Sequence, residues 1–143
     1  MLPQKVIALA QKVREEVEVW VYPNSDINCV TLQGACLIAS YALYQVLKAN
    51  SYSPKLVLGT DWKLVSSHAW IELDGYVLDI TSTQFGYKKE VLAIKADRYR
   101  LRKQFADTNI SQYGIFERFD WGGQSPVMYK KEIKDLTKAL TSV

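Results

Sequence analysis

Histidine and cysteine are scarce in this chain of 143 residues, which contains one histidine, His68, and two cysteines, Cys29 and Cys36. A structural zinc site usually needs four paired cysteine or histidine ligands, so these three residues exclude one. Two cysteines are also too few for a disulfide scaffold. They suffice for one thiol–imidazole pair, and any such pair must use His68.

Long apolar runs are missing as well. The chain has no run of 18 apolar residues that could span a bilayer. Its first 20 residues show neither the uninterrupted apolar segment nor the small-residue cleavage site of a signal peptide. We therefore expect a cytoplasmic protein with no membrane partner, in a compartment that keeps both thiols reduced.

The length and composition predict one globular domain over residues 1–143. The net charge of +3 is unevenly spread, because residues 87–103 hold seven basic and two acidic side chains. Such a run is usually a solvated face, and the alternative is contact with an anionic partner. Nucleic acid is not the partner that we expect.

Apolar periodicity predicts three helices. The first begins near Pro3, and the second runs from Ala35 to Ala49 with Asn50 as a left-handed stop. The second is apolar almost all round, which is typical of a central, buried helix. The third opens with Ser125 as cap and Pro126 in its first turn. Its inner face would carry Tyr129, Ile133, Leu136 and Leu140.

Four strands are predicted between the second and third helices, over residues 55–59, 67–73, 76–81 and 90–96. The second and third flank Asp74-Gly75, a strong signal for a two-residue hairpin turn. Helices followed by a run of strands and a closing helix favour the α+β class.

The hairpin register places the single histidine. A turn at Asp74-Gly75 pairs Leu73 with Tyr76, and the alternation of side chains then separates two faces. One face is apolar and aromatic: Ala69, Ile71, Leu73, Tyr76, Leu78 and Ile80. The other carries His68, Trp70, Glu72, Val77, Asp79 and Thr81. His68 and Asp79 are diagonal neighbours about 7–8 Å apart, so the carboxylate can hold one imidazole nitrogen and leave the other free.

Cys36 is the better candidate for the thiol partner, because it lies in the first turn of the second predicted helix. Unpaired N–H groups there favour a thiolate, and an adjacent imidazole favours it further. Its own backbone N–H can donate to an oxyanion. The alternative is a small buried core residue, as most free cysteines are. Cys29 has no such context and is interpreted as structural.

The run Gly34-Ala35-Cys36 and the run from His68 to Thr81 resemble the transglutaminase-like branch of the papain-like cysteine hydrolases. The resemblance covers about residues 30–86, and small bacterial and phage members share the Asp-x-Thr-x-x-Gln-Phe run that starts at Asp79. It implies a papain-like core, in which the helix bearing Cys36 packs on a small antiparallel sheet bearing His68 and Asp79. In that core Cys36 would be the nucleophile, His68 the base and then the acid, and Asp79 the residue that orients it.

The implied function is a thiol-dependent amide hydrolase or acyl-transferase of the cysteine peptidase or amidase type, acting through a thioester. The substrate would be a peptide, a protein or a small amide. We expect Gln33, Trp62 and Trp70 to contact it. Trp70 is either exposed beside the base or covered by the segment Asp107–Gly123. No cofactor is expected, and a metal site of Cys36, His68 and Asp79 fits the pattern less well than the triad. The alternative is a catalytically silent binding module whose basic segment 87–103 contacts an anionic partner.

Overall fold

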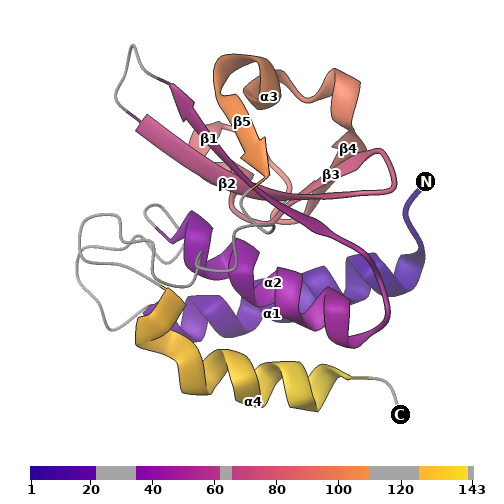
Figure 1. The fold of residues 1–143 in the computed structure, drawn as a ribbon, viewed down its shortest axis with the longest axis vertical. Coiled ribbons are helices and arrows are strands. Elements are labelled where there is room, and N and C mark those ends of the chain that lie inside the picture. The colour runs from indigo at the N-terminus through magenta and orange to yellow at the C-terminus, as the bar shows by residue number, and fades with distance from the viewer. Residues whose placement is uncertain (22–34, 62–65, 110–125, 142–143) are drawn as a thin grey trace.

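The computed structural model describes residues 1–21, 35–61, 66–109 and 126–141. Within these ranges the chain is an α+β fold, as expected, built on a five-stranded antiparallel sheet of order β4-β3-β2-β1-β5 (Figure 1). The helices are α1 (Gln4–Val21), α2 (Cys36–Ala49), α3 (Arg100–Gln104) and α4 (Lys130–Leu140). The strands are β1 (Lys55–Asp61), β2 (Ser66–Leu73), β3 (Tyr76–Asp79), β4 (Leu92–Lys95) and β5 (Ala106–Asn109). Short 3-10 turns are η1 (Ser82–Phe85), η2 (Ala96–Arg98) and η5 (Pro126–Tyr129).

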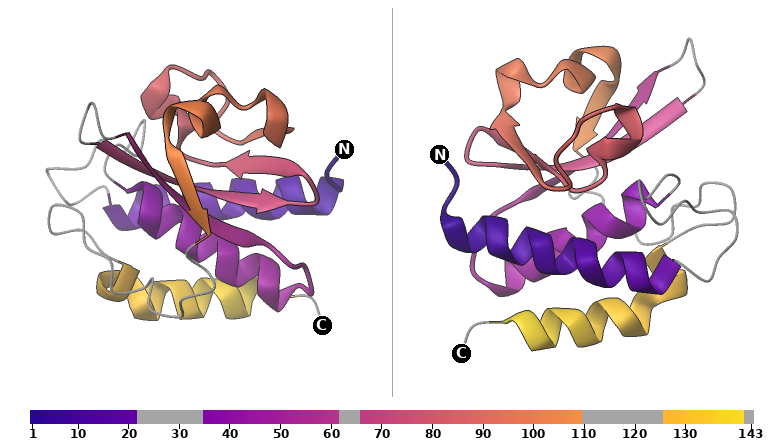
Figure 2. Two further views of the ribbon diagram at one scale, coloured as in Figure 1. Left: turned by 45° about the horizontal axis from the view of Figure 1, so that its top comes forward. Right: turned by 180° about the vertical axis from the view of Figure 1, so that it is seen from behind.

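Helix α2 lies at the centre of the molecule, between the sheet and α4 and beside α1 (Figures 1 and 2). Ten of its 14 residues are buried, which confirms the central position predicted from its apolar sequence. The predicted left-handed stop at Asn50 is wrong, because Asn50 has φ −99° whereas Ser51 has φ +68°. Asn50 closes the helix with its side-chain amide instead, which donates to the carbonyl oxygens of Val46 and Leu140.

Helix α1 buries its predicted apolar face, and one charged residue with it. Arg14 is 1% exposed, and its guanidinium donates to Ile80 O over 2.6 Å and to the Glu18 carboxylate over 2.8 Å. The sequence pattern did not predict this burial. Arg14 thereby fastens α1 to the chain that follows β3. No helix in the described ranges is long and apolar enough to cross a membrane.

The hairpin between β2 and β3 has the predicted turn and register. Asp74 and Gly75 have φ values of +52° and +80°, as a two-residue turn requires. Leu73 pairs with Tyr76, and the ladder extends as far as the pair of Ile71 and Leu78. The three further pairs expected from residues 68–70 are not formed, because β3 ends at Asp79.

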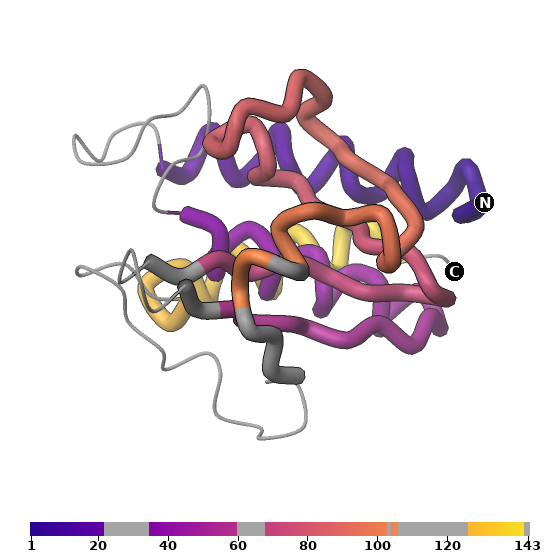
Figure 3. The backbone as a smooth tube through the Cα atoms, turned by 90° about the horizontal axis from the view of Figure 1, so that it is seen from above, coloured from indigo at the N-terminus to yellow at the C-terminus, as the bar shows by residue number. Residues whose placement is uncertain are grey.

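The second face of the hairpin is covered, by a segment that the sequence pattern did not identify. The chain on either side of β4, between residues 82 and 105, crosses this face of the sheet, opposite α1, α2 and α4 (Figure 3). It closes a second core, formed by Val57, Trp70, Val77, Leu92, Tyr99, Leu101 and Phe105. The expectation of an exposed Trp70 is therefore wrong, since its side chain is fully buried. Strand β5, which pairs with β1, was also missed.

Gly59 allows this second core to close. It lies in β1 directly opposite His68 of β2. A Cβ atom at this position would lie 2.5 Å from Phe105 Cβ and 2.9 Å from Trp70 Cη2. Both distances are far below van der Waals contact, so only glycine lets the two rings approach the strand.

We expect Gly59→Ala to lower the free energy of unfolding by about 1–3 kcal/mol, because the added methyl group overpacks the second core. Urea denaturation measures this change. Ala93→Ser at an exposed position of β4 is the control and should change stability by less than about 0.5 kcal/mol. Equal stability of the alanine variant and the wild type would contradict the assignment.

Candidate functional site

An imidazole–carboxylate pair lies buried between the sheet and the chain that covers it. His68 of β2 and Asp79 of β3 are both 0% exposed, and His68 Nε2 lies 2.6 Å from Asp79 Oδ2. This is the contact expected from the hairpin register. It commits one ring nitrogen of His68 to the carboxylate and leaves Nδ1 for other partners.

Asp79 accepts hydrogen bonds at both of its oxygens. Oδ1 accepts from the Thr81 backbone N–H over 2.9 Å and from Thr81 Oγ1 over 3.3 Å. The first of these bonds is an Asx-type turn, which explains why the chain leaves the strand here. Oδ2 accepts from both His68 and the Tyr99 hydroxyl. The buried carboxylate is therefore fully paired, as a buried charge must be.

Cys36 begins α2 and is 3% exposed. One helical turn later, Ser40 Oγ donates to Ala69 O over 3.1 Å, next to His68 in β2. Because residues four apart lie on one face of a helix, this bond ties the α2 face that begins at Cys36 to strand β2. The preceding residue, Ala35, gives the helix no side-chain cap. The thiol therefore lies at a helix start whose partial positive charge favours an anion.

The charge states of His68 and Asp79 depend on each other. Burial alone would lower the pKa of the His68 imidazole, but the charge and hydrogen bond of Asp79 and the neighbouring Cys36 thiol outweigh burial and raise it to about 10. Burial would likewise raise the pKa of Asp79, but His68, Tyr99 and Thr81 together lower it. The pair therefore favours the imidazolium–carboxylate state.

Aromatic rings and one amide enclose the imidazole. Phe85 meets the His68 ring edge-on at 4.6 Å between centroids, and the rings of Trp70 and Phe105 lie at 5.7 Å and 6.1 Å. The Gln84 side-chain nitrogen lies 3.3 Å from Nδ1. An amide can present either its NH2 group or its oxygen, so Gln84 fits both protonation states of this nitrogen. Water is kept from most of the ring.

The structure pairs His68 with Asp79, and the Cys36 thiol, the third group predicted as catalytic, is near enough to contribute to the raised pKa of His68. Trp70 lies beneath the imidazole as a packing residue, with its indole N–H donating to Glu72 over 3.0 Å. Gln33, Trp62 and Cys29 lie outside the described residues. In the described part of the chain, no three His, Cys, Asp or Glu side chains are grouped to hold a metal ion.

Two residues of the site were not assigned from the sequence. Gln84 belongs to the Asp-x-Thr-x-x-Gln-Phe run, and its place five residues after Asp79 was the only signal for it. Tyr99 lies 20 residues beyond Asp79, inside the basic segment. No local pattern connects such a tyrosine to the hairpin, since only the path of the covering chain does so.

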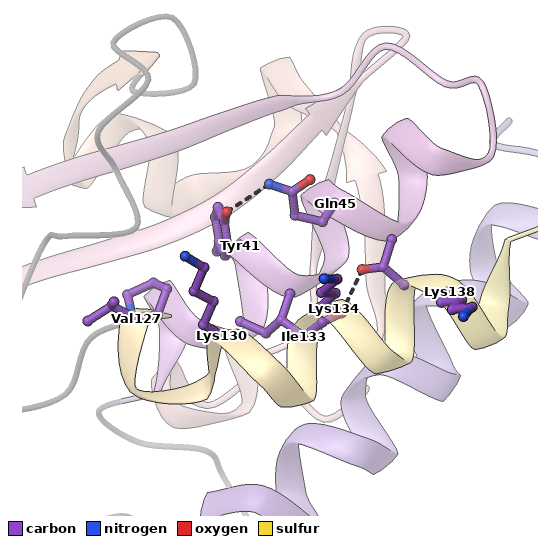
Figure 4. Close-up of a pocket in the computed structure, with 9 residues that line it drawn as sticks. Tyr41, Gln45, Val127, Lys130, Ile133, Lys134 and Lys138 are labelled. Atoms are coloured by element: carbon purple, nitrogen blue, oxygen red, sulfur yellow. Dashed lines mark hydrogen bonds between the residues drawn. The ribbon is translucent and has the colours of Figure 1, made fainter.

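A surface hollow of about 520 Å³ lies elsewhere, between α2 and α4 (Figure 4). Its residues are Tyr41, Gln45, Pro126, Val127, Lys130, Ile133, Lys134, Thr137 and Lys138. They include no thiol, imidazole or carboxylate, so this hollow is separate from the candidate site.

Comparisons of the chain with protein-family models, with curated proteins and with solved structures found no match.

The wild type should lose stability relative to His68→Gln as the pH rises from about 6.5 to about 10. The raised pKa of His68 means that the stability due to its protonation is complete below its ordinary pKa and is lost as pH approaches the folded value. The difference should fall by at most about 1.4 kcal/mol per pH unit. Urea denaturation at several pH values measures it, and a constant difference would contradict the coupling. Asp79 has a lowered pKa, so its contribution is lost only on the acid side.

Proposed function

We propose that this protein is a thiol-dependent amide hydrolase or acyl-transferase of the cysteine peptidase or amidase type. In this proposal its core is the papain-like or transglutaminase-like one, and Cys36, His68 and Asp79 form the catalytic triad. The single observation that carries the proposal is the buried imidazole, held at Nε2 by Asp79 and influenced by the Cys36 thiol. A surface pair of His and Asp would not need this burial or a thiol at a helix start.

The reaction follows from the groups present. In the resting pair, Nδ1 of His68 already holds the proton that the Cys36 thiol has given up. The Cys36 thiolate sulfur then forms a bond to the carbonyl carbon of an amide. The C–N bond then breaks, the imidazolium gives its proton to the departing amine, and a thioester remains on Cys36. Water or an acceptor amine, deprotonated by His68, attacks the thioester and releases Cys36. Atoms and protons balance without a cofactor.

Asp79 and the start of α2 supply the electrostatic support. Asp79 holds the imidazole in one orientation and stabilises its protonated form, which carries positive charge in each half of the reaction. The backbone N–H of Cys36, in the first turn of α2, can donate to the oxyanion of the tetrahedral intermediate.

The burial of the site makes access part of the proposal. Cys36 is 3% exposed and His68 is fully buried, so the atoms that cover the thiol must move before a carbonyl group reaches the sulfur. A dry site strengthens the thiolate–imidazolium attraction. The same burial means that a small, neutral reagent is the best first probe of the thiol.

The basic segment does not favour the binding-module alternative. Arg102 pairs with Glu72 over 3.0 Å, and Arg100 donates to Phe85 O over 2.7 Å. Between β3 and Arg100, the aromatic side chains of Phe85, Tyr87 and Tyr99 pack in or against the second core. These contacts explain the segment as the cover of the sheet.

Iodoacetamide should alkylate Cys36 faster near neutral pH than it alkylates a free model thiol, because the imidazole favours the thiolate. His68→Gln should slow the reaction by at least about tenfold, and mass spectrometry of the labelled peptide measures it. Cys36→Ser and Cys29→Ser assign the reactive thiol, since only the first should abolish fast labelling. If Cys36 in the wild type reacts no faster than a free thiol, the proposed function fails.

A further inference from the structure

Tyr99 is a buried phenol with one strong polar contact. It lies between η2 and α3, and its side chain is fully buried. Its hydroxyl donates to Asp79 Oδ2, the same oxygen that faces His68 Nε2. A phenol can serve there only as a donor to the carboxylate, because burial and the charge of Asp79 raise its pKa and keep it neutral.

The fold gives Tyr99 a fixed position. Its ring packs edge-on against Trp70 at 5.7 Å and lies 5.9 Å from the ring of Tyr87. Its backbone N–H donates to Ala96 O. Arg100, the next residue, points its guanidinium over the Tyr87 ring at 4.8 Å. The basic segment is therefore held by contacts on both sides of Tyr99. These contacts fix the position of the phenol against Asp79.

We propose that Tyr99 is a positioning residue of this site: by donating to Asp79 Oδ2 it limits how strongly the carboxylate holds the proton of His68. The inference rests on the proposed function only for its catalytic meaning. An imidazole that serves first as base and then as acid must release its proton as well as take it. A carboxylate with its full charge directed at Nε2 would hold the imidazolium too tightly, and a second donor on the same oxygen shares that charge.

The other groups around the pair are accounted for. Cys36 of α2 acts on His68, and Tyr87 acts on the Tyr99 hydroxyl. Arg14 of α1 donates to Ile80 O, and Glu72 of β2 accepts from Trp70. These last two charges engage neighbouring groups. Thr81 donates to Asp79 Oδ1, so Tyr99 is the side chain that donates, beside His68, to Oδ2.

Tyr99→Phe removes only the hydroxyl group and tests the proposal. Because His68 is the single histidine, its 15N and 1H imidazole resonances report the titration without ambiguity. We expect the His68 titration midpoint to rise by about 0.5–1 pH unit, the effect of one lost hydrogen bond. At a fixed pH of 7, the Nε2–H proton should move further downfield.

Two further proteins control the experiment. Tyr87→Phe removes the hydroxyl of the ring that lies tilted against Tyr99, and no hydrogen bond joins Tyr87 to Asp79 in the described part of the chain. This variant should leave the His68 titration unchanged. A fluorotyrosine placed at position 99 is a stronger hydrogen-bond donor. It should lower the His68 titration midpoint and move the Nε2–H proton upfield. It also serves if Tyr99→Phe fails to fold.

The outcomes separate the two proposals. Unchanged His68 resonances in Tyr99→Phe, or equal shifts in Tyr87→Phe, would overturn the role of Tyr99 and leave the proposed function standing. Shifted resonances in a protein whose Cys36 is no more reactive than a free thiol would support the role of Tyr99 and overturn the proposed function.

Discussion

Removing an imidazolium and a carboxylate from water costs several kcal/mol for each ion, and their mutual attraction recovers this only when every remaining lone pair is satisfied. In this protein the His68–Asp79 pair is fully buried and meets that condition. Thr81 supplies the donors to one carboxylate oxygen, and Tyr99 supplies a second donor to the other. Much of the fold beyond the hairpin places these donors against Asp79 and excludes water from the pair.

The chain from residue 82 to residue 105 performs both tasks. It places Phe85 against the imidazole and Tyr99 against the carboxylate, and it closes the second core over them. Its aromatic residues face inward, and six of its basic residues are exposed: Lys88, Lys89, Lys95, Arg98, Arg100 and Arg102. On the opposite side, Arg14 ties the start of this segment to α1. The site is therefore held by all layers of the molecule and not by the hairpin alone.

The parts of the site that depend on local sequence were predictable. A two-residue turn fixes a register, and the register placed His68 beside Asp79; helix periodicity placed Cys36 at a helix start. The parts that depend on distant chain were not. The burial of the second face and the contact of Tyr99 require segments 20 or more residues away to fold back, and no periodicity encodes that path. The burial of Arg14 was not predicted for the same reason, since its partners other than Glu18 lie 66 or more positions along the chain.

The order of the strands sets when the site can form during synthesis. Cys36 is made 63 residues before Tyr99, and β1 gains its outer neighbour β5 only later still. At roughly 5–20 residues per second, the ribosome needs roughly 3–13 s to add that stretch. During this interval the Cys36 thiol lacks both a His68 imidazole in its final position and the chain that encloses that imidazole. The contacts that enclose the His68–Asp79 pair can therefore form only after this stretch of chain has been made.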